Sequence, residues 1–123
     1  MPMRMLVVDD EEAICFALRR YFLTRGFQVD TAQELEEAQA LLVNGSYDIV
    51  IVDLRLTETH QAEGLNLLSY LREYSPQTRA ILLTAYANRG VSEAAAARGA
   101  GRVLKKPVAL PELGQAVTAL LAT

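Results

Sequence analysis

Four acidic residues follow directly on an apolar run near the start of the chain. Residues 5–8 read MLVV and residues 9–12 read DDEE. A strand that ends in the interior needs a turn residue at that point, so local structure does not require four acids. Further along, Asp53, Thr84 and Lys106 stand at the ends of other short apolar runs. Carboxylates, a hydroxyl group and an ammonium group gathered in one place would bind a cation and an anionic group together.

The chemistry of such a site follows from its charges. Carboxylates within several ångström repel one another, and at an intermediate dielectric each close pair costs on the order of a few kcal/mol. Magnesium is the natural ion to offset them, because Mg²⁺ takes oxygen ligands and often uses one or two carboxylates together with a phosphate. A lysine charge and a threonine hydroxyl facing the same point complete a site for a phosphoryl group. Asp9, Asp10 and Asp53 are therefore candidate magnesium ligands, with Thr84 and Lys106 beside them.

The elements that must position these residues are indicated by the hydrophobic pattern. Short apolar or β-branched runs predict strands, and the segments between them carry apolar residues at helical spacing. The first helical segment places Ile14, Leu18 and Phe22 on one face, and Gly26 follows where a helix C-terminus belongs. The predicted strands are residues 5–8, 27–32, 48–53, 80–85 and 102–106, and the predicted helices are about 14–22, 34–44, 64–74, 91–101 and 111–121.

Strands that alternate with helices predict a parallel sheet with helices on both faces, because right-handed crossover connections place them there. The expected fold class is α/β: a flavodoxin-like (βα)5 three-layer sandwich whose five-stranded parallel sheet has the order 2-1-3-4-5. Residues 1–123 would form one domain. All carboxyl ends of parallel strands lie at one edge, and ligands bind where the strand order reverses. The acidic cluster is expected at that edge.

Composition and charge exclude several other classes of protein. The 123 residues carry a formal net charge of −3, so this domain alone is not expected to bind nucleic acid or a membrane surface. The one cysteine, Cys15, excludes an intrachain disulfide, and its apolar helical surroundings predict a core position in a reducing compartment. No apolar run approaches the ~18 residues of a membrane span, and MPMRML lacks the apolar region of a signal peptide. We expect a cytoplasmic protein.

Four short motifs together resemble the receiver domain of two-component response regulators, the CheY-like family. They are VVDDEE, IVDLRL, LLTAY and LKKP, and the resemblance covers the whole chain. It implies that Asp10 holds Mg²⁺ directly, that Asp9 does so through water, and that Asp53 and the backbone carbonyl of Arg55 are further ligands. Mg²⁺ is the cofactor that the family uses.

The same resemblance assigns the roles of the remaining site residues. Asp53 would be the phosphoacceptor, the hydroxyl of Thr84 would bond to the incoming phosphoryl group, and Ala85 is small enough to admit that group. Lys106 rather than Lys105 matches the family's lysine, because it directly precedes a proline.

The function that the resemblance implies is that of a phosphorylated switch. The domain would accept a phosphoryl group from the phosphohistidine of a sensor histidine kinase or of a histidine phosphotransfer protein. Phosphorylation would then change an output surface, and an output domain or a homodimer would carry the signal onward. Such a domain is a signalling module and not an enzyme. Arg55 and Tyr86 occupy the positions that set the rate of phosphate loss in the family, and their bulk implies slow loss.

Other interpretations of the same residues stay open at this point. Asp9 and Asp10 could serve only to cap the first helix, whose dipole favours acids. The chain could be a receiver-like docking module that no longer uses phosphate. A haloacid-dehalogenase-like phosphatase would also place its nucleophile at Asp53, but it needs an acid two residues later, where Arg55 stands.

Two segments depart from the family pattern. The loop of residues 54–63 is longer than usual, with Thr57 in place of a proline, and we expect His60 to lie in an exposed loop there and not in a metal cluster. Val103 stands where many receivers carry Tyr or Phe, and a β-branched side chain has essentially one rotamer with which to respond. We therefore expect residues 85–100, with their alanine-rich helix, to respond to phosphorylation instead.

Overall fold

Five strands alternate with five helices in the described part of the chain. The structure is a computed structural model that describes residues 2–54, 58–85 and 88–122, with side chains described except those of residues 54 and 58–63. The elements are β1 (Arg4–Val8), α1 (Glu12–Leu23), β2 (Gln28–Ala32), α2 (Leu35–Asn44), β3 (Ile49–Leu54), α3 (Glu58–Tyr74), β4 (Arg79–Thr84), α4 (Arg89–Ala97), β5 (Arg102–Lys105) and α5 (Leu110–Leu121).

The strands form one parallel sheet in the order β2-β1-β3-β4-β5. This is the predicted topology, and it makes β1 and β3 neighbours although β2 lies between them in the sequence. The register pairs Leu54 with Thr84 and Thr84 with Lys105, so β3, β4 and β5 end at about the same level. The residues that follow these strands therefore meet at one edge of the sheet.

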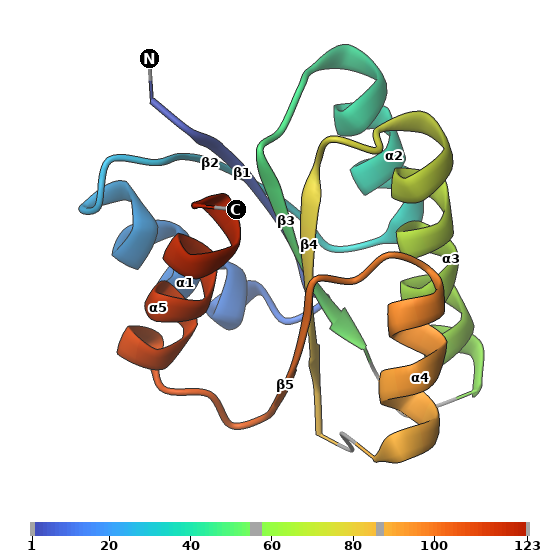
Figure 1. Cartoon of the computed structure of the whole chain (residues 1–123). Helices are drawn as coiled ribbons and strands as arrows, with labels where there is room; N and C mark the ends of the chain where they lie inside the picture. The colour runs from blue at the N-terminus through green and yellow to red at the C-terminus, as the bar shows by residue number, and fades with distance from the viewer. Residues whose placement is uncertain (1, 55–57, 86–87, 123) are drawn as a thin grey trace.

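Helices cover both faces of the sheet, as Figure 1 shows: α1 and α5 lie on one side, and α2, α3 and α4 on the other. Alternation along each strand divides the core between the two layers. In β1, Met5 and Val7 pack toward α1 and α5, whereas Leu6 and Val8 pack toward α2 to α4. Each fully buried side chain of this kind stabilises the fold by about 1.5–3 kcal/mol. The predicted three-layer sandwich is confirmed.

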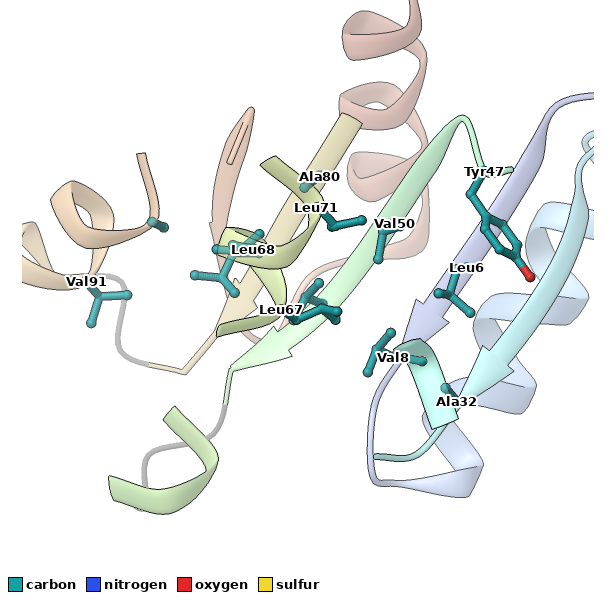
Figure 2. Packing of buried hydrophobic residues seen from close by; sticks show 14 residues of the cluster. Leu6, Val8, Ala32, Tyr47, Val50, Leu67, Leu68, Leu71, Ala80 and Val91 are labelled. Atoms are coloured by element: carbon teal, nitrogen blue, oxygen red, sulfur yellow. The ribbon is translucent and has the colours of Figure 1, made fainter. Parts of the chain in front are cut away.

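The layer of α2, α3 and α4 is built on leucine and valine side chains (Figure 2). Leu67, Leu68 and Leu71 of α3 are buried over Val50 of β3 and its neighbours. On the opposite face, Cys15 is buried among apolar side chains, which confirms its predicted core position. Burial raises the pKa of its thiol to about 11.

Several helices begin earlier than predicted, and the reason can be given for α3 and α4. α3 starts at Glu58 and not near residue 64, so the prediction of a loop at His60 was wrong: its backbone is helical. Residues 58–63 contain neither glycine nor proline, and nothing in them prevents a helix even though the apolar spacing begins only at Leu65. α4 starts at Arg89 because the side chain of Asn88 caps it, accepting a hydrogen bond from the backbone N–H of Val91 at 2.9 Å.

In the described part of the chain, no helix combines the length and the apolar character that crossing a bilayer requires.

Candidate functional site

Three carboxylates meet where β1 and β3 end. Asp9, Asp10 and Asp53 each offer one oxygen within 4.8 Å of the others. Asp9 and Asp53 are almost completely buried, with side chains 2% and 3% exposed, while Asp10 is partly buried. The structure thus brings together the three side chains that the sequence proposed as metal ligands.

The backbone and side chain of Asp9 are held by three hydrogen bonds. Its N–H donates to the carbonyl of Ala32 at 3.0 Å, its carbonyl accepts from the thiol of Cys15 at 3.2 Å, and its Oδ1 accepts from the backbone N–H of Glu11 at 2.9 Å. The other oxygen, Oδ2, is buried and accepts no hydrogen bond from any residue that the structure describes. A buried carboxylate oxygen of this kind, directed into an acidic cluster, fits the hard oxygen ligand set that a divalent cation requires.

Electrostatics at Asp9 reflect this position. Burial raises the pKa of Asp9 to about 6, and the carboxylates of Asp53 and Asp10 add to the rise. The N–H of Glu11 and the ammonium group of Lys106 act in the opposite direction. The cluster therefore carries repulsion that an additional cation would relieve.

The lysine that reaches the acids is Lys106, the first residue after β5. Its Nζ lies 2.5 Å from Oδ1 of Asp53 and 3.9 Å from Oδ2 of Asp9. Its backbone N–H donates to the carbonyl of Thr84 at 2.7 Å, which ties it to the end of β4. Lys105, one residue earlier, is exposed. The structure therefore places Lys106, and not Lys105, in the site.

Thr84 and Ala85 complete this edge of the sheet. Thr84 is the last residue of β4 and is fully buried, whereas Ala85 follows it and is exposed. Ala85 and Lys106 also line a mostly apolar groove of about 440 Å³ between the start of α1 and the segment that joins β5 to α5. This groove was not predicted, although the helical spacing of Ile14, Ala17 and Leu18 indicates its α1 side.

Neither Asp9 nor Asp10 is the N-cap residue of α1. α1 begins at Glu12, and its N-cap residue, Glu11, makes no side-chain hydrogen bond to the helix.

Of the predicted site residues, Arg55 lies outside the described residues, as do Tyr86 and Thr57.

Comparison with known proteins decides the family. The family model described as the response regulator receiver domain matches residues 5–118. The chain belongs to this family. The match favours the receiver interpretation of the acidic cluster over the phosphatase interpretation, and it agrees with the order of the sequence motifs.

Individual receivers and regulators resemble the chain over nearly its whole length. The response regulator MprA of Mycobacterium sp. (strain KMS) is 36% identical over 98% of this chain and 51% of its own length. A crystal structure of a response regulator from Thermotoga maritima superposes with a TM-score of 0.90 at 27% identity and covers 100% of both chains. A Burkholderia pseudomallei response regulator, solved with a phosphorylated aspartic acid, a calcium ion and citrate, has a TM-score of 0.85 at 28% identity and covers 98% of this chain and 69% of its own.

The chain spans only part of the length of its curated relatives: 61% of a photosynthetic apparatus regulatory protein of Rhodobacter capsulatus and 51% of MprA. Those regulators therefore contain regions with no counterpart in the 123 residues.

Proposed function

We propose that residues 1–123 form a phosphoacceptor domain in which Asp53 receives a phosphoryl group. The observation that carries this proposal is the position of Lys106, whose Nζ lies 2.5 Å from Asp53 inside a group of three carboxylates. A lone ion pair would need one acid. Two further acids at the same point are costly unless a cation binds beside them, and Mg²⁺ held by carboxylates commonly takes a phosphate oxygen as a further ligand.

The residues that would hold Mg²⁺ are Asp9, Asp10 and Asp53, and the unsatisfied Oδ2 of Asp9 fits this role. The backbone carbonyl of Arg55 is a further proposed ligand. When bound, Mg²⁺ would neutralise charge on the transferring group and align it with the carboxylate.

The proposed reaction is a phosphoryl transfer from nitrogen to oxygen. A carboxylate oxygen of Asp53 attacks the phosphorus of a phosphohistidine, a P–O bond forms, and the P–N bond of the donor breaks. The donor imidazole leaves with the electron pair and takes up a proton. The ammonium group of Lys106 balances the charge of the phosphoryl oxygens, the hydroxyl of Thr84 donates to one of them, and the small side chain of Ala85 leaves room for the group.

The proposed partner is a sensor histidine kinase or a histidine phosphotransfer protein, which also places the domain in the cytoplasm. The apolar groove beside Lys106 and Ala85 supports a protein donor, because it offers contact area next to the phosphoacceptor. The domain is a signalling switch and not a turnover enzyme. Its output passes to a further domain or to a second copy of the chain.

Phosphorylation of Asp53 is tested with two donors, acetyl phosphate and a phosphorylated histidine phosphotransfer protein, each with and without Mg²⁺. Intact-mass measurement should show one phosphoryl group on the wild type and none on Asp53→Asn. Asp48→Asn is the matched control, because Asp48 lies just before β3 at the opposite edge of the sheet, where its Oδ2 accepts from the N–H of Arg4. It should be labelled like the wild type.

The lysine gives a second arm of the same test. Lys106→Ala should slow labelling by about 100–1000-fold, the range found when one electrostatic donor is removed from a catalytic site, whereas Lys105→Ala should leave the rate unchanged. Full labelling of Asp53→Asn would show that another residue is the acceptor. No labelling of the wild type by either donor would favour the docking module that does not use phosphate.

A further inference from the structure

α4 begins close to the candidate site. β4 carries Thr84 at its last position and leads toward Asn88, whose side chain caps α4 through the N–H of Val91. A change at the backbone of Thr84 and Ala85 therefore reaches the N-terminal end of α4 before it reaches the C-terminal end.

α4 rests on α3, which is the more firmly packed of the two helices. Leu67, Leu68 and Leu71 of α3 are each at most 2% exposed. In α4, where the structure describes every residue, only Val91 and Ala95 are buried. The two helices lie on the same face of the sheet (Figure 1), so α3 forms a rigid support for a helix that is held by few apolar contacts of its own.

The C-terminal end of α4 has a polar connection to this support. The guanidinium of Arg72, in the last turn of α3, donates a hydrogen bond to the carbonyl oxygen of Ala97, the last residue of α4. The last carbonyls of a helix lack partners within the helix, and a positive charge there suits the helix dipole. Gly99 follows with φ +89°, and a Cβ built on it would lie 3.7 Å from Cδ of Arg72. The aliphatic part of Arg72 thus passes directly over the chain as it leaves α4.

The N-terminal half of α4 has no comparable connection among the described residues. Its ion pair joins Arg89 and Glu93 at 2.9 Å, within the helix itself, and both side chains are largely exposed. That pair stiffens the helix without attaching it to the sheet or to α3. The two ends of α4 therefore differ in how they are held.

We propose that Arg72 anchors the C-terminal end of α4 to α3, so that within α4 the response to phosphorylation is confined to the N-terminal half, residues 88–93, and does not extend to residue 100 as the sequence alone led us to expect. The trigger in this proposal rests on the proposed function of Asp53. Arg72 is a positioning residue, because it acts through the carbonyl of Ala97 and does not touch the phosphoryl group. It sets where the helix can move.

Segment-resolved amide hydrogen exchange tests the anchor in three variants. Arg72→Leu keeps an apolar side chain beside Gly99 but removes the donor, and Arg72→Lys restores the charge. Arg98→Leu is the matched control, because the guanidinium of Arg98 donates to the carbonyl of Ala94 within α4 and links no second element.

Without any phosphoryl mimic, the amides of Arg98, Gly99 and Ala100 should exchange about fivefold faster in Arg72→Leu, which corresponds to the ~1 kcal/mol of one net hydrogen bond. These amides donate to the carbonyls of Ala95 and Ala96 and so report on the end of the helix. Arg72→Lys should recover part of the protection. Arg98→Leu should leave Gly99 and Ala100 at the wild-type rates.

With beryllofluoride and Mg²⁺, exchange in the wild type should change in residues 88–93 and stay constant in residues 94–100, whereas in Arg72→Leu the change should extend through residue 100. Equal protection in Arg72→Leu and Arg98→Leu would overturn the anchor. A change spread evenly along α4 of the wild type would overturn the confinement. Labelling of Asp53 by acetyl phosphate, measured on the same samples, should be normal in all variants, and its absence from the wild type would contradict the proposed function and not the anchor.

Discussion

The two carboxylate oxygens of Asp9 have different surroundings, although they belong to one side chain. Oδ1 accepts from the N–H of Glu11, and Oδ2 lies 3.9 Å from the ammonium nitrogen of Lys106 in the acidic cluster. The first contact orients the side chain and the second oxygen becomes available to a cation. A single hydrogen bond in the turn after β1 thus prepares one of the proposed metal ligands.

The residue types of the site could be predicted from the sequence, but their orientation could not. An acid after an apolar run is visible as a letter, and the proline after Lys106 distinguished that lysine from Lys105. Which carboxylate oxygen of Asp9 accepts a hydrogen bond depends on where the turn places the N–H of Glu11. The bond to the backbone carbonyl of Asp9 depends on how α1 positions the thiol of Cys15. Such contacts arise from tertiary structure and leave no sequence signal.

A second polar cluster lies at the opposite edge of the sheet, around Tyr47. Its hydroxyl donates to Oδ2 of Asp30 at 2.6 Å, and the guanidinium of Arg4 lies 4.6 Å from the ring centroid. The pKa of Tyr47 is raised from 10.0 to about 12, chiefly by burial and to a smaller extent by the hydrogen bond to Asp30. The folded protein therefore keeps this proton at a pH where the unfolded chain loses it.

This shift predicts a loss of stability at alkaline pH. The contribution of Tyr47 should be complete below pH 10 and should be lost as the pH rises to about 12, because the unfolded state binds fewer protons in that window. The loss should be up to about 3 kcal/mol. Urea unfolding at a series of pH values should show a smaller decline for Tyr47→Phe than for the wild type. Tyr74→Phe, at an exposed tyrosine, should follow the wild type, and equal declines in all three proteins would contradict the assignment.

At the scale of elements, hydrophobic spacing predicted the existence and order of the helices and strands but not all of their ends. α3 begins at Glu58, in a segment whose residues are compatible with a helix but carry no apolar period. The cap of α4 is Asn88, which lies before the predicted start of this helix near residue 91, since only the residues after it carry the alanine-rich pattern. The link from Arg72 to Ala97 could not be predicted, since it depends on how two helices lie on one face of the sheet.

The contact between α1 and α5 includes an unfavourable feature at Tyr21. The hydroxyl of Tyr21 is buried and finds no hydrogen-bond partner among the described residues. It lies over Gly114 in the interior of α5, where a Cβ would approach it to 3.1 Å. Glycine inside a helix costs about 1 kcal/mol relative to alanine. The position of the Tyr21 hydroxyl therefore leaves little room for any residue but glycine at position 114, although glycine is unfavourable for the helix.

Removing the hydroxyl should make alanine acceptable at this position. Tyr21→Phe should be neutral or stabilise the protein by up to about 1 kcal/mol, because an unsatisfied buried group is lost. Gly114→Ala should stabilise the Tyr21→Phe background by up to about 1 kcal/mol, the gain in helix propensity, and should stabilise the wild type less, because there the new Cβ meets the hydroxyl. Urea unfolding of the four proteins measures this coupling. The same effect of Gly114→Ala in both backgrounds would show that the hydroxyl is not the obstacle.

At the scale of the whole molecule, the fold class followed from the alternation of strand and helix patterns, and the site followed from the fold. Once the sheet order is 2-1-3-4-5, the ends of β1 and β3 must be adjacent, and Asp9 and Asp53 with them. The sequence could indicate only the α1 side of the groove beside Lys106, because the opposite wall comes from the segment before α5. The positions of site residues at strand ends could be predicted from the strand order. Features that depend on the orientation of a helix relative to a loop could not.

Binding of Mg²⁺ to the carboxylates of Asp9, Asp10 and Asp53 should stabilise the whole fold by mass action. A ligand that binds only the native state adds about 2.7 kcal/mol at 100 times its dissociation constant. The midpoint temperature of thermal unfolding should therefore rise when Mg²⁺ is added to the wild type. The shift should be lost in Asp10→Ala and retained in Asp48→Ala, whose carboxylate lies at the far edge of the sheet. An unchanged shift in Asp10→Ala would remove Asp10 from the ligand set.

The distribution of the site over distant strands also has a kinetic consequence. The ion pair of Asp53 and Lys106 joins residues 53 positions apart, and the acids meet only after β1 has paired with β3 across the intervening β2. Contacts between residues so far apart require costly loop closure and tend to form late in folding. The proposed cation site is then absent from most of the folding route and present only in the finished protein. We expect Mg²⁺ to lower the rate constant of unfolding and to leave that of folding nearly unchanged in stopped-flow measurements, so that the bound ion prolongs the lifetime of the native state without helping the chain to reach it.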